Sequence, residues 1–159
     1  MIEKWKGEHV TKPLKPATIV QGYNYKAIGE HSEAAVMTKL IELGYGVLKP
    51  FGDNRRYDLV IEDAESKFWR VQCKTGRSNG EYISFTPASL YYHTRAGRTT
   101  YGSRSYHGQI DYFAVYCPEN KEVYLVPVEH TGTSQMNLRL AATKNNQEKG
   151  VRWAKDYEL

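Results

Sequence analysis

Four polar side chains in the first half of the chain are of the types that a metal-dependent phosphodiesterase uses: Glu33, Asp58, Gln72 and Lys74. Asp58 lies at the start of the apolar run 57–61, and Gln72 and Lys74 lie within the apolar run 69–75. Acids, amides and lysines are rare inside strands unless they have a use there. Hard divalent cations bind oxygen ligands and assist the hydrolysis of phosphodiesters. The four residues therefore predict a site for metal-assisted cleavage.

The two apolar runs predict a β-hairpin, because the polar segment 62–66 between them is typical of a tight turn. In an extended strand, side chains two residues apart point the same way. Gln72 and Lys74 therefore share one face, while Val71 points into the core on the other. Pairing of the two strands would bring Asp58 close to Gln72 and Lys74.

A helix is expected over residues 25–43, because apolar residues recur at helical spacing, at Val36, Leu40 and Leu43. Gly44 is well placed to end this helix. Glu33 shares the inward face of the helix, from which it could reach the same point as the hairpin residues.

Each residue has a chemical role in the predicted site. Asp58 would anchor Mg²⁺ or Mn²⁺, with the Gln72 amide oxygen and the backbone carbonyl of Cys73 as further ligands. Glu33 would act through a metal-held water. Lys74 would position and help deprotonate the attacking water, or stabilise the charge that develops on the phosphoryl group. The alternative is a surface hairpin with ordinary solvated side chains, and only the combination of all four residues favours the site.

The order of elements predicts an α/β or mixed α+β fold with a central mixed sheet and a covering helix. Further strands are expected over 45–50, 81–85, 111–117, 122–128 and 138–140, with the third and fourth forming a hairpin. Residues 1–22 are basic and proline-punctuated, and we interpret them as an N-terminal arm that is a solvated tail or a DNA contact. Residues 23–159 are expected to form one domain.

Bulk composition limits the function classes. The chain has 159 residues, 40% hydrophobic residues and a formal net charge of +4, which permits a polyanionic partner without requiring one. Cys73 and Cys117 form no metal-binding pair, and the five histidines are scattered, so we expect reduced thiols and no zinc site. Without a long apolar run or a secretory signal, a cytoplasmic protein with no membrane segment is expected.

Double-stranded DNA is the partner that the basic segments favour. Residues 94–108 contain three arginines and no acidic residue, and we interpret residues 95–104 within them as a DNA-contacting loop with Arg95, Arg98 and Arg104 as contacts. The alternative is a basic surface loop. Arg77 follows the predicted metal site, where it could hold a phosphate. Because cleavage of both strands usually requires two centres about a two-fold axis, we expect a homo-oligomer, a dimer or a tetramer.

Several segments resemble the PD-(D/E)XK nuclease superfamily. Its helix, second motif and (D/E)XK strand are similar to residues 29–36, 56–60 and 71–75. Its group I intron-encoded homing endonuclease branch is similar to residues 50–58, 74–77, 111–117 and 144–154. Two positions depart from the superfamily pattern: Tyr57 replaces the proline, and Gln72 replaces the acid of the third motif. The intron-encoded branch resembles this chain in using glutamine there.

The resemblance implies a restriction-endonuclease-like core and a Mg²⁺-dependent DNA endonuclease. A restriction-type or Holliday-junction-resolving nuclease with the same site is an alternative. A catalytically inactive DNA-binding module is another, since Gln72 removes one negative charge from the cation site. Intact Glu33, Asp58 and Lys74 favour activity over this last alternative.

Overall fold

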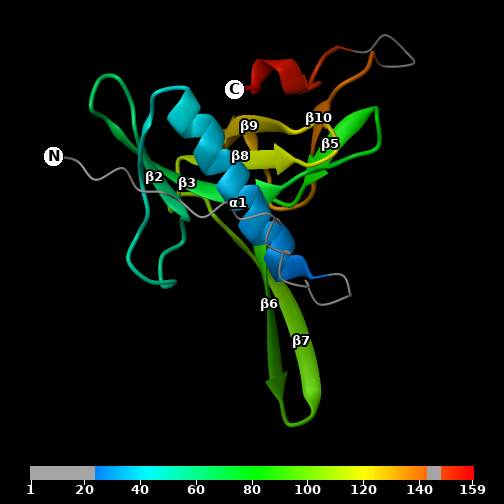
Figure 1. Ribbon diagram of the computed structural model, residues 1–159. Helices are drawn as coiled ribbons and strands as arrows, with labels where there is room; N and C mark the ends of the chain where they lie inside the picture. The colour runs from blue at the N-terminus through cyan, green and yellow to red at the C-terminus, as the bar shows by residue number, and fades with distance from the viewer. Residues whose placement is uncertain (1–23, 143–147) are drawn as a thin grey trace, which may run out of the picture.

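The computed structural model describes residues 24–142 and 148–159, so the N-terminal arm and the basic segment 144–147 lie outside the described residues (Figure 1). Its regular elements, in chain order, are α1 (Tyr25–Glu42), β1 (Gly46–Leu48), β2 (Leu59–Glu62), β3 (Phe68–Thr75), β4 (Arg77–Ser78), β5 (Tyr82–Phe85), β6 (Ala88–Arg95), β7 (Arg98–Ser105), β8 (Tyr112–Cys117), β9 (Glu122–Pro127), a short 3-10 helix (Val128–His130), β10 (Met136–Arg139) and a second 3-10 helix (Ala154–Asp156).

Helix α1 has a capping motif at each end. The Asn24 side chain accepts hydrogen bonds from two backbone amides of the first turn, each at 3.1 Å. Gly44 adopts φ +88° and ends the helix as its sequence position predicted. The predicted inward face was wrong at Leu43, which is 49% exposed, because the buried residues follow four-residue spacing at Ser32, Val36 and Leu40.

The central sheet has the strand order β1-β2-β3-β8-β9. All neighbours are antiparallel except β3 and β8, which are parallel, so the sheet is mixed. The predicted β2–β3 hairpin is confirmed, with Leu59 paired to Val71 and Ile61 paired to Trp69. The predicted hairpin of β8 and β9 is confirmed as well.

Two hydrophobic cores lie on the two faces of this sheet. One packs α1 against the sheet through Val36, Leu40, Leu59, Ile61, Val71, Ala114, Tyr116 and Val123. The other packs β8 and β9 against a smaller sheet of order β10-β5-β4, through residues that include Phe113, Val115, Ile83 and Leu138. Strand β8 contributes alternate residues to both cores, which explains its continuous apolar sequence. The mixed-sheet α/β architecture agrees with the fold class that the sequence predicted.

Strands β6 and β7 form a long two-stranded ribbon that projects from the rest of the molecule (Figure 1). The prediction of a loop over residues 95–104 was wrong. The strands pair along their whole length, from Ala88 opposite Ser105 to Arg95 opposite Arg98. The turn residues Ala96 and Gly97 have φ of +50° and +76°, as tight hairpin turns require.

None of the described helices combines the length and the apolar character needed to cross a membrane. Both cysteines are free thiols, Cys117 buried and Cys73 half-buried.

Candidate functional site

Asp58 and Gln72 are in direct contact across the β2–β3 hairpin. The Asp58 amide donates to the Val71 carbonyl at 2.9 Å, which extends the strand pairing by one residue. The Asp58 carboxylate accepts hydrogen bonds on Oδ2 from Gln72 Nε2 at 2.6 Å and from the Cys73 amide at 2.8 Å. Within the described part of the chain, no hydrogen bond reaches its Oδ1. One carboxylate oxygen is therefore fixed by the strand, and the other stays available to a ligand.

The surroundings of Asp58 disfavour its negative charge. Burial raises the pKa of Asp58, and the negative charge of Glu33 adds to this rise. The hydrogen bonds from the Cys73 amide and Gln72, and the positive charge of Lys74, lower the pKa, but the net shift is upward. A nearby cation would favour the ionised form of Asp58 and so oppose the upward shift of its pKa.

Glu33 reaches Asp58 from the helix side. Both carboxylates line one cavity of about 420 Å³, together with the segment that follows β1. The Glu33 side chain is 25% exposed, and its carboxylate forms an ion pair with the Lys49 ammonium. This hydrogen bond is the main reason that the pKa of Lys49 is raised. Lys49 was missed at the sequence level, although pairing of Leu48 with Val60 places the end of β1 beside the start of β2.

Lys74 lies near Asp58 but bonds elsewhere. Its Nζ donates to the carbonyl of Ala88, the first residue of β6, at 3.0 Å. Burial lowers the pKa of Lys74, and the positive charge of Arg56 lowers it further, while Asp58 opposes both effects. Lys74 lines a second cavity of about 520 Å³ between α1 and the base of the ribbon. The structure thus joins Asp58 directly to Gln72, and places Glu33 and Lys74 near them with no hydrogen bond or ion pair to Asp58.

Arg56 and Tyr106 were also missed as members of this region. The Arg56 guanidinium donates to Gln109 Oε1 at 2.6 Å, Ser89 Oγ at 2.8 Å and the Ser105 carbonyl at 3.1 Å. It lies 4.0 Å from the centroid of the Tyr106 ring. The only sequence signal was the position of Arg56, two residues before Asp58.

The oxygen donors suit a hard divalent cation. They are the carboxylates of Asp58 and Glu33, the amide oxygen of Gln72 and the carbonyl of Cys73. Gln72 presents its nitrogen to Asp58, and this nitrogen also lies 3.5 Å from the Cys73 carbonyl oxygen. Among the described residues there is no cluster of three or more His, Cys, Asp and Glu side chains. The two carboxylates and two neutral oxygens therefore fit Mg²⁺ or Mn²⁺ with few charged ligands.

The arginines expected to contact DNA lie on one face of the ribbon. Cross-strand partners share a face, and side chains alternate along each strand. The register therefore groups Arg95, Arg98 and Arg104 with His93. All four are exposed. The opposite face carries Leu90, Tyr92 and Tyr101, which are 65%, 72% and 79% exposed.

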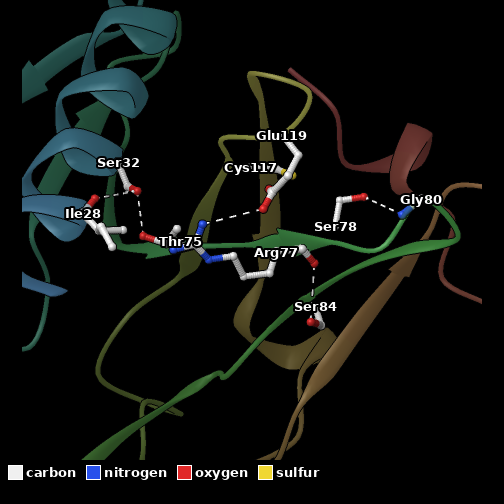
Figure 2. A network of polar contacts seen from close by, with 9 residues as sticks. All are labelled: Ile28, Ser32, Thr75, Arg77, Ser78, Gly80, Ser84, Cys117 and Glu119. Atoms are coloured by element: carbon white, nitrogen blue, oxygen red, sulfur yellow. Dashed lines mark hydrogen bonds and ion pairs between the residues drawn. The ribbon is translucent and has the colours of Figure 1, made fainter. Parts of the chain in front are cut away.

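Arg77 lies beyond the end of β3 and forms an ion pair with Glu119, at 3.6 Å between Nη1 and Oε1 (Figure 2). In the same view, the Ser32 hydroxyl of α1 meets the Thr75 hydroxyl of β3 at 2.6 Å. This contact fastens the helix to the strand one residue after Lys74. Arg77 is thus held near the site, although its charge is shared with Glu119.

Comparisons with known proteins agree with this architecture. A family model described as PD-(D/E)XK endonuclease matches residues 23–159. The solved structure of a bacterial homing endonuclease, I-Ssp6803I, is similar with a TM-score of 0.66 and 22% sequence identity, over 86% of this chain and 89% of that chain. At this identity the likeness demonstrates a shared fold. No curated protein sequence matches the chain.

Proposed function

The chain belongs to the PD-(D/E)XK endonuclease family, and we propose that it hydrolyses phosphodiester bonds of double-stranded DNA in a Mg²⁺-dependent reaction. The observation that supports this most is the contact of the Asp58 carboxylate with Gln72 and the Cys73 amide, beside Lys74. A half-buried acid with one oxygen held and one available is the arrangement expected of a cation anchor.

Four groups of the chain would hold the cation. Asp58 would bind it through Oδ1, with Gln72 and the Cys73 carbonyl as neutral oxygen ligands and Glu33 acting through a bound water. When bound, such a cation lowers the pKa of water and polarises a phosphoryl oxygen. Relative to a site with a third acid, the neutral Gln72 lowers the charge of the ligand set, so we expect weaker cation binding.

Lys74 would supply the ammonium group of the reaction. Burial lowers its pKa, so the proton on Nζ is less firmly held than on a surface lysine. Nζ could then accept a proton from an attacking water, or donate a hydrogen bond to a phosphoryl oxygen. Nζ can take either role while one of its N–H groups donates to the Ala88 carbonyl, because a lysine ammonium has three donors.

The ribbon would provide the DNA contact. A two-stranded β-ribbon fits the major groove of B-form DNA. The basic face with Arg95, Arg98 and Arg104 can bind phosphates or guanine edges, while Arg77 would hold a phosphate near the site. The structural neighbour is described as a homing endonuclease, and we propose a homing-type activity with a homo-oligomer that presents two centres to the two strands.

Cleavage of supercoiled plasmid with Mg²⁺ tests the catalytic proposal. The wild-type protein should nick or linearise the plasmid, and chelation of the metal should stop the reaction. Asp58→Asn and Lys74→Gln should each lower the rate by at least about a hundredfold, as loss of a group that acts in the transition state does. Arg152→Gln, which changes an exposed arginine outside the site, is the control. Cleavage that survives both site substitutions would place the chemistry elsewhere.

The salt dependence of DNA binding tests the contact face. Replacing the three ribbon arginines by glutamine should reduce the slope of log K against log salt by up to about 3, because each phosphate contact contributes about 0.9. An unchanged slope would remove the ribbon from the interface. A four-way junction offered beside duplex DNA would separate a homing or restriction substrate from a junction-resolving one.

A catalytically inactive DNA-binding module is the second candidate. It is favoured by one observation, the hydrogen bond that holds Lys74 Nζ on the Ala88 carbonyl instead of on Asp58. Salt-dependent binding of duplex DNA, with no cleavage in Mg²⁺ or Mn²⁺, would support this module over the nuclease.

A further inference from the structure

Arg56 connects the candidate site to both strands of the ribbon. Its three hydrogen-bond partners are Ser89 in β6, Ser105 at the end of β7, and Gln109 after the ribbon. The guanidinium is a rigid planar fork, so three bonds at 2.6–3.1 Å fix its orientation as well as its position. The residue itself lies two positions before Asp58.

Tyr106 and Lys74 complete the same junction. The Tyr106 ring is 5% exposed and packs edge-on against Phe113 of the core, at 5.4 Å between centroids. Arg56 lies 4.0 Å from this ring and Lys74 Nζ lies 5.1 Å from it. Lys74 also holds the Ala88 carbonyl at 3.0 Å. Two cations beside one buried ring therefore hold the base of the ribbon, and each is two residues from a predicted metal ligand.

The rest of the ribbon contributes to neither core cluster, since no residue of 89–105 belongs to either one. Its direction therefore depends on its base. Eight-residue strands extend roughly 26 Å at the usual rise. A rotation of roughly 10° at the base would displace the tip by roughly 5 Å over that strand length, which is more than the spacing of one DNA base pair.

We propose that Arg56 is the positioning residue that sets the direction of the β6–β7 ribbon relative to Asp58, so that DNA on the basic face presents a phosphodiester to Asp58 and Lys74. This inference rests on the proposed function. In this proposal the ribbon arginines determine the affinity for DNA. Arg56 determines whether a phosphodiester of the bound DNA lies at Asp58 and Lys74.

Arg56→Lys and Arg56→Gln test the proposal, with Arg152→Gln as the matched control on an exposed arginine. The probes are supercoiled plasmid and a fluorescent duplex that spans the cut site mapped with the wild-type protein. We expect the rate at saturating DNA to fall by about 10- to 100-fold. Binding of the duplex should stay within about twofold of wild type, and the cuts should spread to neighbouring positions. Lysine should not restore the rate, because it lacks the planar fork.

Three results would overturn the role of Arg56. The first is a wild-type cleavage rate in Arg56→Gln, and the second is a wild-type cleavage rate in Arg56→Lys. The third is a loss of DNA binding as large as the loss of cleavage, because that result would identify Arg56 as a DNA contact. If thermal melting shows that the Arg56 variants do not fold, Ser89→Ala and Gln109→Ala each remove one partner and must lower the cleavage rate without lowering binding.

The role of Arg56 in holding the ribbon can also be tested without DNA cleavage. If the wild-type protein cuts no DNA, hydrogen exchange in the intact protein decides the question. Arg56→Gln should then speed amide exchange at the base of the ribbon, in the paired segments 88–91 and 102–105, relative to wild type and Arg152→Gln. Unchanged exchange there would refute the role of Arg56 whether or not the protein is a nuclease.

Discussion

Gln72→Glu changes the charge at the centre of the candidate site without changing its size. In the structure, Gln72 Nε2 donates to Asp58 Oδ2 at 2.6 Å. Glutamate cannot donate this hydrogen bond when ionised, and its carboxylate would face that of Asp58. The substitution should therefore destabilise the protein when no divalent cation is present, and a cation should reverse the effect.

The size of the effect follows from the geometry. Two unit charges about 4 Å apart repel each other by about 4 kcal/mol at an effective dielectric constant of about 20. The lost hydrogen bond adds about 1 kcal/mol, while protonation of one carboxyl relieves part of the repulsion. We expect the free energy of unfolding to fall by about 2–4 kcal/mol in chelator near pH 8. In saturating Mg²⁺ the free energy of unfolding of the variant should rise again by about 2 kcal/mol or more. This follows because a ligand at about 100 times its Kd stabilises the folded protein by about 2.7 kcal/mol.

Urea unfolding in chelator and in millimolar Mg²⁺ measures both parts. Gln135→Glu is the control, because Gln135 is exposed and bonds only to Asn137 among the described residues. This control should change stability by no more than about 0.5 kcal/mol and should not respond to Mg²⁺. A Gln72→Glu protein as stable as wild type in chelator would contradict the contact with Asp58. A loss that Mg²⁺ does not reverse would contradict the cation site.

Two further predictions concern the framework that carries the site. Hydrogen bonds from Arg70 lower the pKa of Asp111, so this stabilisation is complete above the ordinary carboxyl pKa and is lost as the pH falls below it, through the lowered pKa of the folded state. Asp111→Asn should cost about 1–2 kcal/mol at pH 7 and progressively less in acid, as pH-dependent urea melts would show, and an equal cost at all pH values would contradict the assignment. At Gly76, an added Cβ would lie 2.7 Å from Ile83 Cγ2, so Gly76→Ala should lower stability by about 1–3 kcal/mol. Gly132→Ala, where nothing lies within 4 Å, should be near neutral, and equal melting curves for the two variants would refute the packing argument.

The sequence predicted the parts of the site that local patterns determine. Alternation of apolar and polar residues and a short turn indicated the β2–β3 hairpin, and this pairing is what brings Asp58 to Gln72. The spacing of Val36 and Leu40, with Gly44 at the end, indicated the helix that carries Glu33.

The parts that were missed depend on contacts between distant segments. The partnership of Glu33 with Lys49 follows from the register of β1 against β2, which no local pattern specifies. Lys74 bonds to Ala88 because the chain returns past β3 as it enters the ribbon. The ribbon itself was interpreted as a loop because both of its faces are exposed, so its strands lack the apolar alternation that marks a half-buried strand.

The independence of the ribbon from both hydrophobic cores has a consequence for how target preference can change. Gly97 has the positive φ that the turn requires, and an added Cβ at Gly102 would lie 2.6 Å from the Tyr91 hydroxyl. Most other substitutions between residues 90 and 103 alter no buried packing, so they cost little folding free energy. On the proposed function, the scaffold could keep one cutting centre while the DNA-contacting surface of the ribbon diversifies. If the ribbon contacts DNA as proposed, a new target could be engineered by exchanging this exposed hairpin while Arg56 and Lys74, which contact its base, stay unaltered.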